Sequence, residues 1–124
     1  MQQPYFLNEA GNKKMKDGIM LWYAGENPFI KSITGTDVTV HSTYNGVAVT
    51  QNYPSLDNAA IALQADPNTE VYVEGNVTEM SNFSSETRIV CHNTALTDLN
   101  CESCPRLTSL DLSKNTALTE LYCS

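Results

Sequence analysis

The sequence predicts a mainly β protein, in which an N-terminal β-hairpin module and a short capping helix lead into a β-solenoid built from repeats. Three observations predict this order: an alternating apolar pattern around an Asn-Gly pair, an amphipathic pattern of helical period after it, and a regular spacing of leucine and cysteine in the last third. We divide the 124 residues into an arm and hairpin anchoring module (1–54), a capping helix with a first degenerate coil (55–87), and repeats that we expect to be incomplete (88–124).

Charge and hydropathy argue against two classes of partner. The chain has 14 acidic and 7 basic residues, a net charge of -7, and the excess of acids lies after residue 31. Such a surface repels the closely spaced phosphates of DNA, so we expect no nucleic-acid partner. The longest apolar run, Ile19–Ala24, is far shorter than the about 20 residues of a membrane helix. We therefore expect no membrane-spanning segment, and this run is also too short to serve as the core of a signal peptide.

Residues 1–18 show neither helical nor strand periodicity and are interrupted by Pro and Gly, so we expect an arm that needs a partner surface to order it. Its apolar residues stand together in an otherwise polar segment, which favours a docking anchor. A short buried strand follows over Ile19–Ala24. We assign assembly or docking to four residues: Tyr5, Phe6, Leu7 and Trp22.

Two alternating segments flank Asn45-Gly46 within residues 36–50 and predict a β-hairpin. Both residues of the pair tolerate the positive φ that a type I′ turn requires. Four valines are expected on the buried face: Val38, Val40, Val47 and Val49. The threonines and His41 are then expected to face water, so we interpret His41 as an exposed strand residue without a catalytic or ligand role.

After Pro54, Ser55 can cap a helix over residues 56–65. Four residues share one face of that helix, at positions i, i+3, i+4 and i+7: Leu56, Ala59, Ala60 and Leu63. A turn then leads into a strand over Val71–Gly75. This order of elements resembles the N-terminal cap of β-solenoids, and a generic helix packed on a small sheet remains the alternative.

The last third of the chain contains an internal repeat. The pattern L-x-x-L-x-[LC] occurs three times, eleven residues apart, and Asn-Thr-Ala-Leu recurs after 22 residues. We predict that the repeated apolar side chains form one continuous stacked core: Leu96, Leu99, Cys101, Leu107, Leu110, Leu112, Leu118, Leu121 and Cys123. At the bends we expect Asn93 and Asn115 to bond to backbone groups through their side-chain amides.

The string LxxLxCxxxxxLxxLDLSKNTAL resembles the short, irregular type of bacterial leucine-rich repeat, of about 21 residues, found in surface proteins of Bacteroidota. The resemblance is strong over residues 88–124 and degenerate over 71–87. Two departures weaken the register, because Cys104 stands where Asn is usual and Pro105 lengthens that copy. The resemblance implies a leucine-rich-repeat solenoid that serves as a non-enzymatic recognition or structural scaffold.

The cysteines and histidines are the candidate sites of chemistry in this sequence. Cys101-x-x-Cys104 with Cys91 and His92 nearby has the composition of a zinc site, but Cys101 falls on an inward position of the repeat, so a zinc-binding module is a minor alternative. The only other histidine is His41, and no glycine-rich phosphate loop is present. We expect no enzymatic activity, no metal and no cofactor.

The chain stops just after the third repeat segment, and an uncapped coil exposes its core. Either further repeats follow or another subunit covers this coil, and we expect protein partners at the arm and at this last coil, within an oligomer or a larger assembly. One hypothesis is a structural attachment protein, such as a head fibre or decoration protein of a phage virion. The other is a secreted or cell-surface adhesin that binds a protein or glycan. Both place the protein on an outer surface, of a virion or of a bacterial cell.

Overall fold

The computed structural model describes residues 5–25, 28–83, 86–92, 95–103, 109–111 and 119–122. All regular secondary structure in these ranges is β-strand, which confirms the mainly β class. The strands are β1 (Tyr5–Leu7), β2 (Lys13–Met15), β3 (Gly18–Tyr23), β4 (Phe29–Tyr44), β5 (Val47–Ala62), β6 (Val71–Phe83), β7 (Glu86–His92), β8 (Asp98–Ser103), β9 (Ser109–Asp111) and β10 (Glu120–Tyr122).

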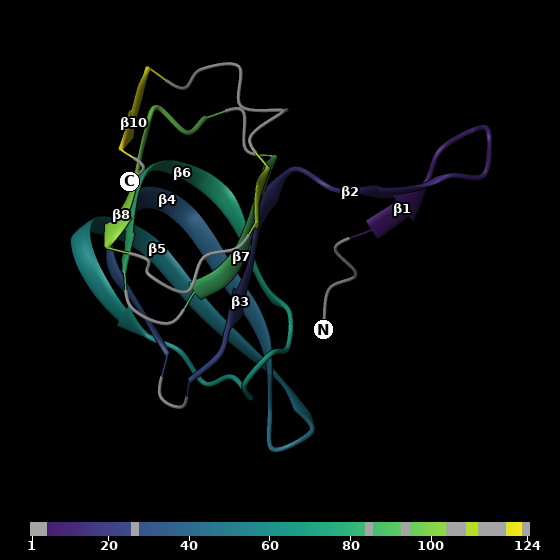
Figure 1. The fold of residues 1–124 in the computed structure, drawn as a ribbon, viewed down its shortest axis with the longest axis horizontal. Helices are drawn as coiled ribbons and strands as arrows, with labels where there is room; N and C mark the ends of the chain where they lie inside the picture. The colour runs from purple at the N-terminus through teal and green to yellow at the C-terminus, as the bar shows by residue number, and fades with distance from the viewer. Residues whose placement is uncertain are drawn as a thin grey trace.

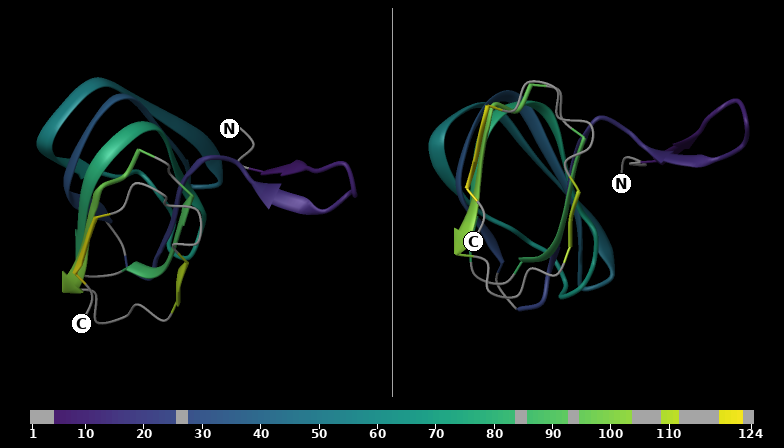
Figure 2. Two further views of the ribbon diagram at one scale, coloured as in Figure 1. Left: turned by 90° about the horizontal axis from the view of Figure 1, so that it is seen from above. Right: turned by 45° about the horizontal axis from the view of Figure 1, so that its top comes forward.

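The strands form two sheets (Figure 1). β1 and β2 pair as an antiparallel hairpin, and the other eight strands form one mixed sheet in the order β10-β8-β6-β3-β7-β9, with β4 joined to β6 and β5 to β4. Pairs among β3 to β7 are antiparallel, whereas β8, β9 and β10 add in parallel. Figure 2 shows this sheet curving around a common interior, and it shows the β1–β2 hairpin projecting outward from the sheet.

The predicted hairpin is confirmed as the turn between β4 and β5. Asn45 and Gly46 both have positive φ, 52° and 75°, as a type I′ turn requires. The carboxylate of Asp66 accepts hydrogen bonds from both turn amides, at 2.8 Å from Asn45 N and 3.1 Å from Gly46 N. Asp66 N in turn donates to Thr43 O at 2.7 Å, so the loop before β6 holds the turn from outside the hairpin.

The predicted capping helix is wrong, because β5 continues through this segment to Ala62. Gly35 pairs with Leu56 and Ile33 with Ala59, so β5 has one residue more than β4 between these pairs. The extra residue belongs to a bulge that includes Asn58, which has a φ of 47°. The bulge changes an alternating strand pattern into an i, i+3 spacing at Leu56 and Ala59, which has the appearance of a helical period.

Two further predictions for the hairpin are wrong. Val47 is 64% exposed and Val49 is only half-buried, although Val38 and Val40 are buried as expected. The pairing of β4 with β6 ends at His41, so the distal part of the hairpin extends past the neighbouring strand. His41 itself, expected to face water, is only 6% exposed.

The sheet is apolar on both faces at its centre. The inner face carries the main core, to which β3 contributes Ile19, Leu21 and Tyr23. The alternate residues of β3, Met20 and Trp22, face the opposite side and belong to a second apolar cluster. This confirms the predicted buried strand over Ile19–Ala24, although the regular strand covers Gly18–Tyr23.

We call strands β3 to β7 the body. Parallel pairing joins the repeat segment to the body. Leu99 of β8 lies between Met80 of β6 and Leu121 of β10, and Leu110 of β9 pairs with Ile89 of β7. Leu96 and Leu99 are fully buried in the main core. The side chains of the other predicted repeat residues lie outside the described part of the structure: Asn93, Cys101, Leu107, Leu110, Leu112, Asn115, Leu118, Leu121 and Cys123.

A threonine ladder runs across the same strands. Both the amide and the hydroxyl of Thr97 donate to Thr78 O, at 2.8 and 3.1 Å. Thr119 repeats the arrangement on Thr97 O, at 2.8 and 3.3 Å, with a sequence separation of 22 residues. The hydroxyl of Thr78 donates to Thr34 O at 3.3 Å and so begins the ladder on β4.

Candidate interaction surfaces

Residues 5–16, here called the arm, fold on the chain itself rather than needing a partner surface. Asn8 closes the turn, since its side-chain Oδ1 accepts hydrogen bonds from Ala10 N and Asn12 N at 3.0 and 2.9 Å. Tyr5 and Met15 are register partners and therefore share one face of the hairpin. That face packs against the second apolar cluster, whose buried members are Met20, Tyr72 and Val90, with Trp22 at its margin.

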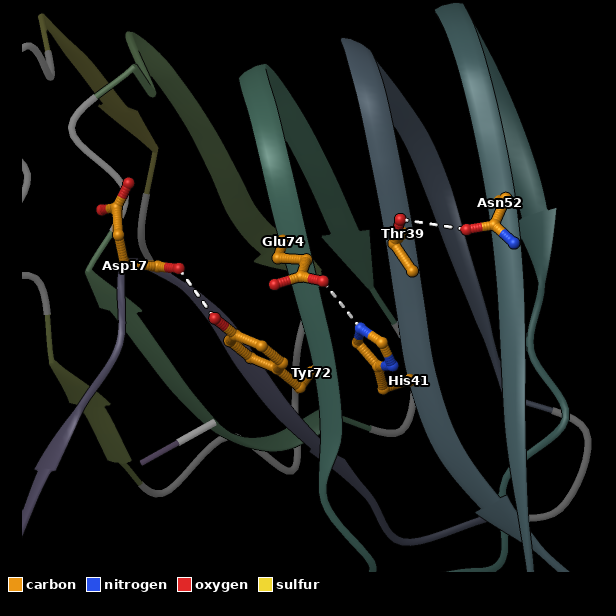
Figure 3. Close-up of polar contacts among 6 residues, drawn as sticks. All are labelled: Asp17, Thr39, His41, Asn52, Tyr72 and Glu74. Carbon is orange, nitrogen blue, oxygen red and sulfur yellow. Dashed lines mark hydrogen bonds and ion pairs between the residues drawn. The ribbon is translucent and has the colours of Figure 1, made fainter. Parts of the chain in front are cut away.

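Two tyrosine hydroxyls connect the arm, and the residue that directly follows it, to the body. Tyr5 OH donates to Glu70 Oε2 at 2.5 Å, and burial, followed by the hydrogen bond and charge of Glu70, raises the pKa of Tyr5 to about 12. Tyr72 OH donates to the carbonyl oxygen of Asp17 at 2.8 Å (Figure 3). Burial, followed by the charges of Glu74 and Asp17, raises the pKa of Tyr72 to about 12.

Raising the pH above 10 is expected to release the arm. The pKa of each tyrosine is about 12 in the folded chain against an ordinary 10.0, so their stabilising contribution is complete below pH 10 and is lost as the pH rises through 12. Trp22 is the only tryptophan, and its fluorescence reports the undocking. Tyr5→Phe should make the arm easier to release at neutral pH. A Trp22 signal that changes only with global unfolding would show that these hydroxyls do not hold the arm.

The arm leaves two large apolar side chains uncovered. Phe6 is 47% exposed and Leu7 is 70% exposed. Of the four residues predicted to dock, Tyr5 and Trp22 therefore pack within the chain: Lys13 Nζ lies 4.2 Å from the centre of the Tyr5 ring, and Arg88 Cζ lies 4.5 Å from that of Trp22. Phe6 and Leu7 remain available to a partner, on an arm that extends from the body (Figures 1 and 2).

On the outer side of β4, β6 and β8, polar side chains align in two rows across the strands. Between the rows, Ile33, Met80 and Leu99 point into the core. We call this surface the polar face and define it by the outward residues of the three strands: Ser32, Thr34, Glu79, Ser81, Asp98 and Asn100. In the backbone register, β10 pairs Glu120 with Asp98 and Tyr122 with Asn100.

A cavity of about 190 Å³ opens on the polar face. Its lining comes from four strands: Ser32, Asn58, Glu79, Met80, Ser81, Asp98, Leu99 and Asn100. Asn58 reaches the cavity from the bulge in β5. There its backbone N–H donates a hydrogen bond to Thr34 Oγ1 at 3.0 Å. Because the side chains of Met80 and Leu99 point into the core, the surface of the cavity consists of strand backbone and of the carboxylates, amides and hydroxyls of the outward residues.

His41 belongs to a polar cluster on β4 and β6 (Figure 3). Its Nε2 lies 2.8 Å from Glu74 Oε1, and its ring stacks on Tyr72 with centroids 5.8 Å apart. A histidine paired with a carboxylate becomes catalytic when its other nitrogen contacts a nucleophile, but Nδ1 of His41 has no hydrogen-bond partner among the described residues. The neighbouring Ser42 points away and donates to Gln64 O at 2.6 Å. This cluster therefore packs two strands together and lacks a positioned nucleophile.

Within the described residues, no three His, Cys, Asp or Glu side chains gather in a way that could hold a metal ion. The side chain of Cys91 is buried. Cys104 and the side chains of Cys101 and Cys123 lie outside the described residues, so the zinc alternative has no geometry to support it. In the same part of the chain, no helix is long and apolar enough to cross a membrane.

Comparison of the chain with protein-family models, with curated proteins and with solved structures found no match.

Proposed function

We propose that the chain is a non-enzymatic structural attachment protein. Its N-terminal module docks through the arm on a larger assembly, such as a phage virion in which it serves as a head fibre or decoration protein. Its leucine-rich repeats stack on the body as a solenoid and project as a stalk or binding surface. The proposal places the protein on the outer surface of that assembly.

The parallel strands at the repeat spacing are the observation that carries this proposal. Leu121 pairs with Leu99 in parallel, and Thr119 repeats the hydrogen bonds of Thr97 at the 22-residue period of the sequence. Each coil therefore presents the same strand edge and the same threonine carbonyl oxygen to the coil that follows it, which is how a repeat array extends. We infer that β6, β8 and β10 lie on one side of the coils and that β7 and β9 lie on the other.

The exposed arm supports the docking part of the proposal. Burying Phe6 and Leu7 against a partner contributes about 1.5–3 kcal/mol for each side chain. The inner face of the arm is already fixed on the body through Tyr5 and Met15, so little conformational entropy is lost when a partner binds the outer part.

The cavity on the polar face favours a second candidate, a secreted or cell-surface leucine-rich-repeat adhesin. Its carboxylates and amides, from Glu79, Asp98 and Asn100, can accept and donate hydrogen bonds to the hydroxyls of a glycan or the backbone of a protein. In that case the polar face, rather than the arm, makes the functional contact.

Co-sedimentation with the assemblies and cell envelopes of the source organism tests the proposal. We expect the wild-type chain to sediment with a high-mass fraction, and the double variant Phe6→Ser/Leu7→Ser to lose at least about tenfold in affinity. The matched control is Tyr44→Ser/Val47→Ser, which removes two equally exposed apolar side chains at the β4–β5 turn.

A loss of co-sedimentation in the control as well would show general surface stickiness and contradict docking through the arm. Retention by the arm variant, combined with loss on Asp98→Ala, would favour the adhesin.

A further inference from the structure

The turn of the β4–β5 hairpin contains the only Asn-Gly pair of the sequence, Asn45-Gly46. Both residues are exposed, and the turn lies beyond His41, where the pairing of β4 with β6 ends. An asparagine loses its side-chain amide most readily when glycine follows it, because glycine has no Cβ to hinder the attack of its backbone nitrogen. This exposed pair is therefore a candidate site of spontaneous covalent modification.

The reaction at such a pair is an intramolecular substitution followed by hydrolysis. The backbone nitrogen of Gly46 attacks Cγ of Asn45, so the N–Cγ bond forms and the Cγ–Nδ2 bond breaks. Nδ2 leaves as ammonia and takes the proton of Gly46 N, and the product is a cyclic imide. Water then opens the imide at Cγ, which gives aspartate, or at the main-chain carbonyl carbon of Asn45, which gives isoaspartate.

The folded turn holds the attacking nitrogen in an unreactive position. Asp66 accepts hydrogen bonds from Asn45 N at 2.8 Å through Oδ1 and from Gly46 N at 3.1 Å through Oδ2. Both N–H groups therefore point toward the same carboxylate, on one side of the turn. The attack requires the peptide plane between Asn45 and Gly46 to rotate until Gly46 N faces the asparagine side chain. That rotation breaks the hydrogen bond from Gly46 to Asp66.

The charge of Asp66 opposes the reaction as well. Gly46 N must lose its proton in order to attack, and the negative charge that then develops lies at hydrogen-bond distance from the Asp66 carboxylate. Like charges so close together repel each other, so the carboxylate raises the barrier to ring closure. It also lowers the population of the rotated conformation from which ring closure starts.

Asp66 is itself held in place by contacts that do not involve its carboxylate. Asp66 N donates to Thr43 O at 2.7 Å, and Thr69 Oγ1 donates to Asp66 O at 2.7 Å. The preceding residue, Ala65, is buried in the main core. The carboxylate is therefore positioned before it binds the turn, and little conformational entropy is lost in binding.

We propose that Asn45 is a deamidation site and that Asp66 keeps it intact in the folded chain. Deamidation places a second carboxylate beside that of Asp66, and isoaspartate also lengthens the main chain of the turn, because the chain then passes through Cγ. Either product weakens the contact between the turn and the loop before β6. The modification therefore releases the tip of the hairpin, and the loss of ammonia makes the release irreversible.

Incubation of the purified chain at mildly alkaline pH, followed by peptide mapping with mass spectrometry, measures the rate of deamidation at Asn45. The same chain in urea gives the rate without the turn. We expect the folded wild type to react at least about tenfold more slowly than the unfolded chain, since hydrogen bonds to a charged group hold the turn. Folded Asp66→Ala should react at least about fivefold faster than folded wild type.

Asp57→Ala is the matched control, because it removes a carboxylate from an exposed position of β5 outside the turn. It should deamidate like the wild type. Asn12, which is exposed and followed by lysine, serves as a reference asparagine within the same chain and should keep its amide. Circular dichroism and the urea midpoint give the unfolded fraction of each variant, which separates global unfolding from release of the turn.

Equal rates in the folded and the unfolded wild type would overturn the inference. A folded Asp66→Ala chain that reacts no faster than the wild type would do the same. If Asp66→Ala does not fold, Asp66→Asn makes the comparison without the charge and should also react faster than the wild type. An Asn45 that keeps its amide even in urea would reject the site itself.

Discussion

Replacing Gly75 by alanine is expected to lower the free energy of unfolding by about 2–5 kcal/mol. Gly75 has a φ of 119°, a backbone conformation that residues with a side chain rarely adopt. A Cβ there would lie 2.3 Å from Asp37 O and 2.9 Å from Val38 Cα. Both of these are backbone atoms of β4. They cannot rotate away as a side chain would, so the two central strands of the body must separate.

Gly46→Ala is the matched control for this substitution. Gly46 also has a positive φ, 75°, but no atom lies within 4 Å of its added Cβ. This variant therefore isolates the cost of the left-handed backbone conformation, about 1–2 kcal/mol. Urea unfolding followed by circular dichroism measures both variants. If Gly75→Ala is no less stable than Gly46→Ala, the close approach of β6 to β4 does not constrain the fold.

The tight passage at Gly75 accompanies a second irregularity in the long hairpin. Two residues of β4 lie between Thr36 and Thr39, whereas one residue of β6 lies between their partners Asn76 and Glu74. The extra residue bulges at Asp37, whose φ is 52°. Bulges of this kind increase the twist of a strand, which helps β4 and β5 to curve around the core.

Local signals predicted the parts of the fold that depend on neighbouring residues. The Asn45-Gly46 turn and the buried strand over Ile19–Ala24 were both predictable, because turn chemistry and apolar runs act within a few residues. The strand that occupies the place of the predicted helix over 56–65 could not be predicted in this way. Long-range pairing with β4 overrides local propensity there, and the bulge at Asn58 changes the apolar spacing.

Of the candidate surfaces, those formed by neighbouring residues could be predicted from the sequence, and those formed by distant strands could not. The apolar group in the arm was visible in the sequence, and Phe6 and Leu7 are indeed exposed. The cavity was not predictable, because Asn58, Glu79 and Asp98 come together only through the pairing of distant strands. His41 was missed for the same reason, since its partner Glu74 is 33 residues away. Only the register of β4 against β6 brings them together.

The repeat also shows how a local pattern can have a long-range consequence. Leu96 and Leu99 are buried in the same core as Ile19 and Ile33 of the N-terminal module. In the solenoid that we propose, the body supplies the first layer on which the repeats stack, as a terminal cap does in repeat proteins. It does so with strands β6 and β7 rather than with the predicted helix.

Leu99→Ala is expected to destabilise the chain by about 2–5 kcal/mol, because Leu99 is fully buried and its truncation leaves a cavity in the main core. The site lies between Met80 and Leu121 in the parallel ladder, so the loss should also loosen β10 from β8. Hydrogen exchange should then show faster exchange of the amides of residues 119–122, together with a lower urea midpoint.

Thr97→Val provides the comparison, since it keeps the shape of the side chain and removes only the hydroxyl that donates to Thr78 O. Its expected cost is about 0.5–1.5 kcal/mol. The backbone bond from Thr97 N to the same oxygen remains, so β8 should stay in place. If Leu99→Ala lowers global stability while residues 119–122 keep their protection, β10 does not depend on the leucine layer. The coils would then not stack through a shared core, and the stalk in the proposed function would lose its physical basis.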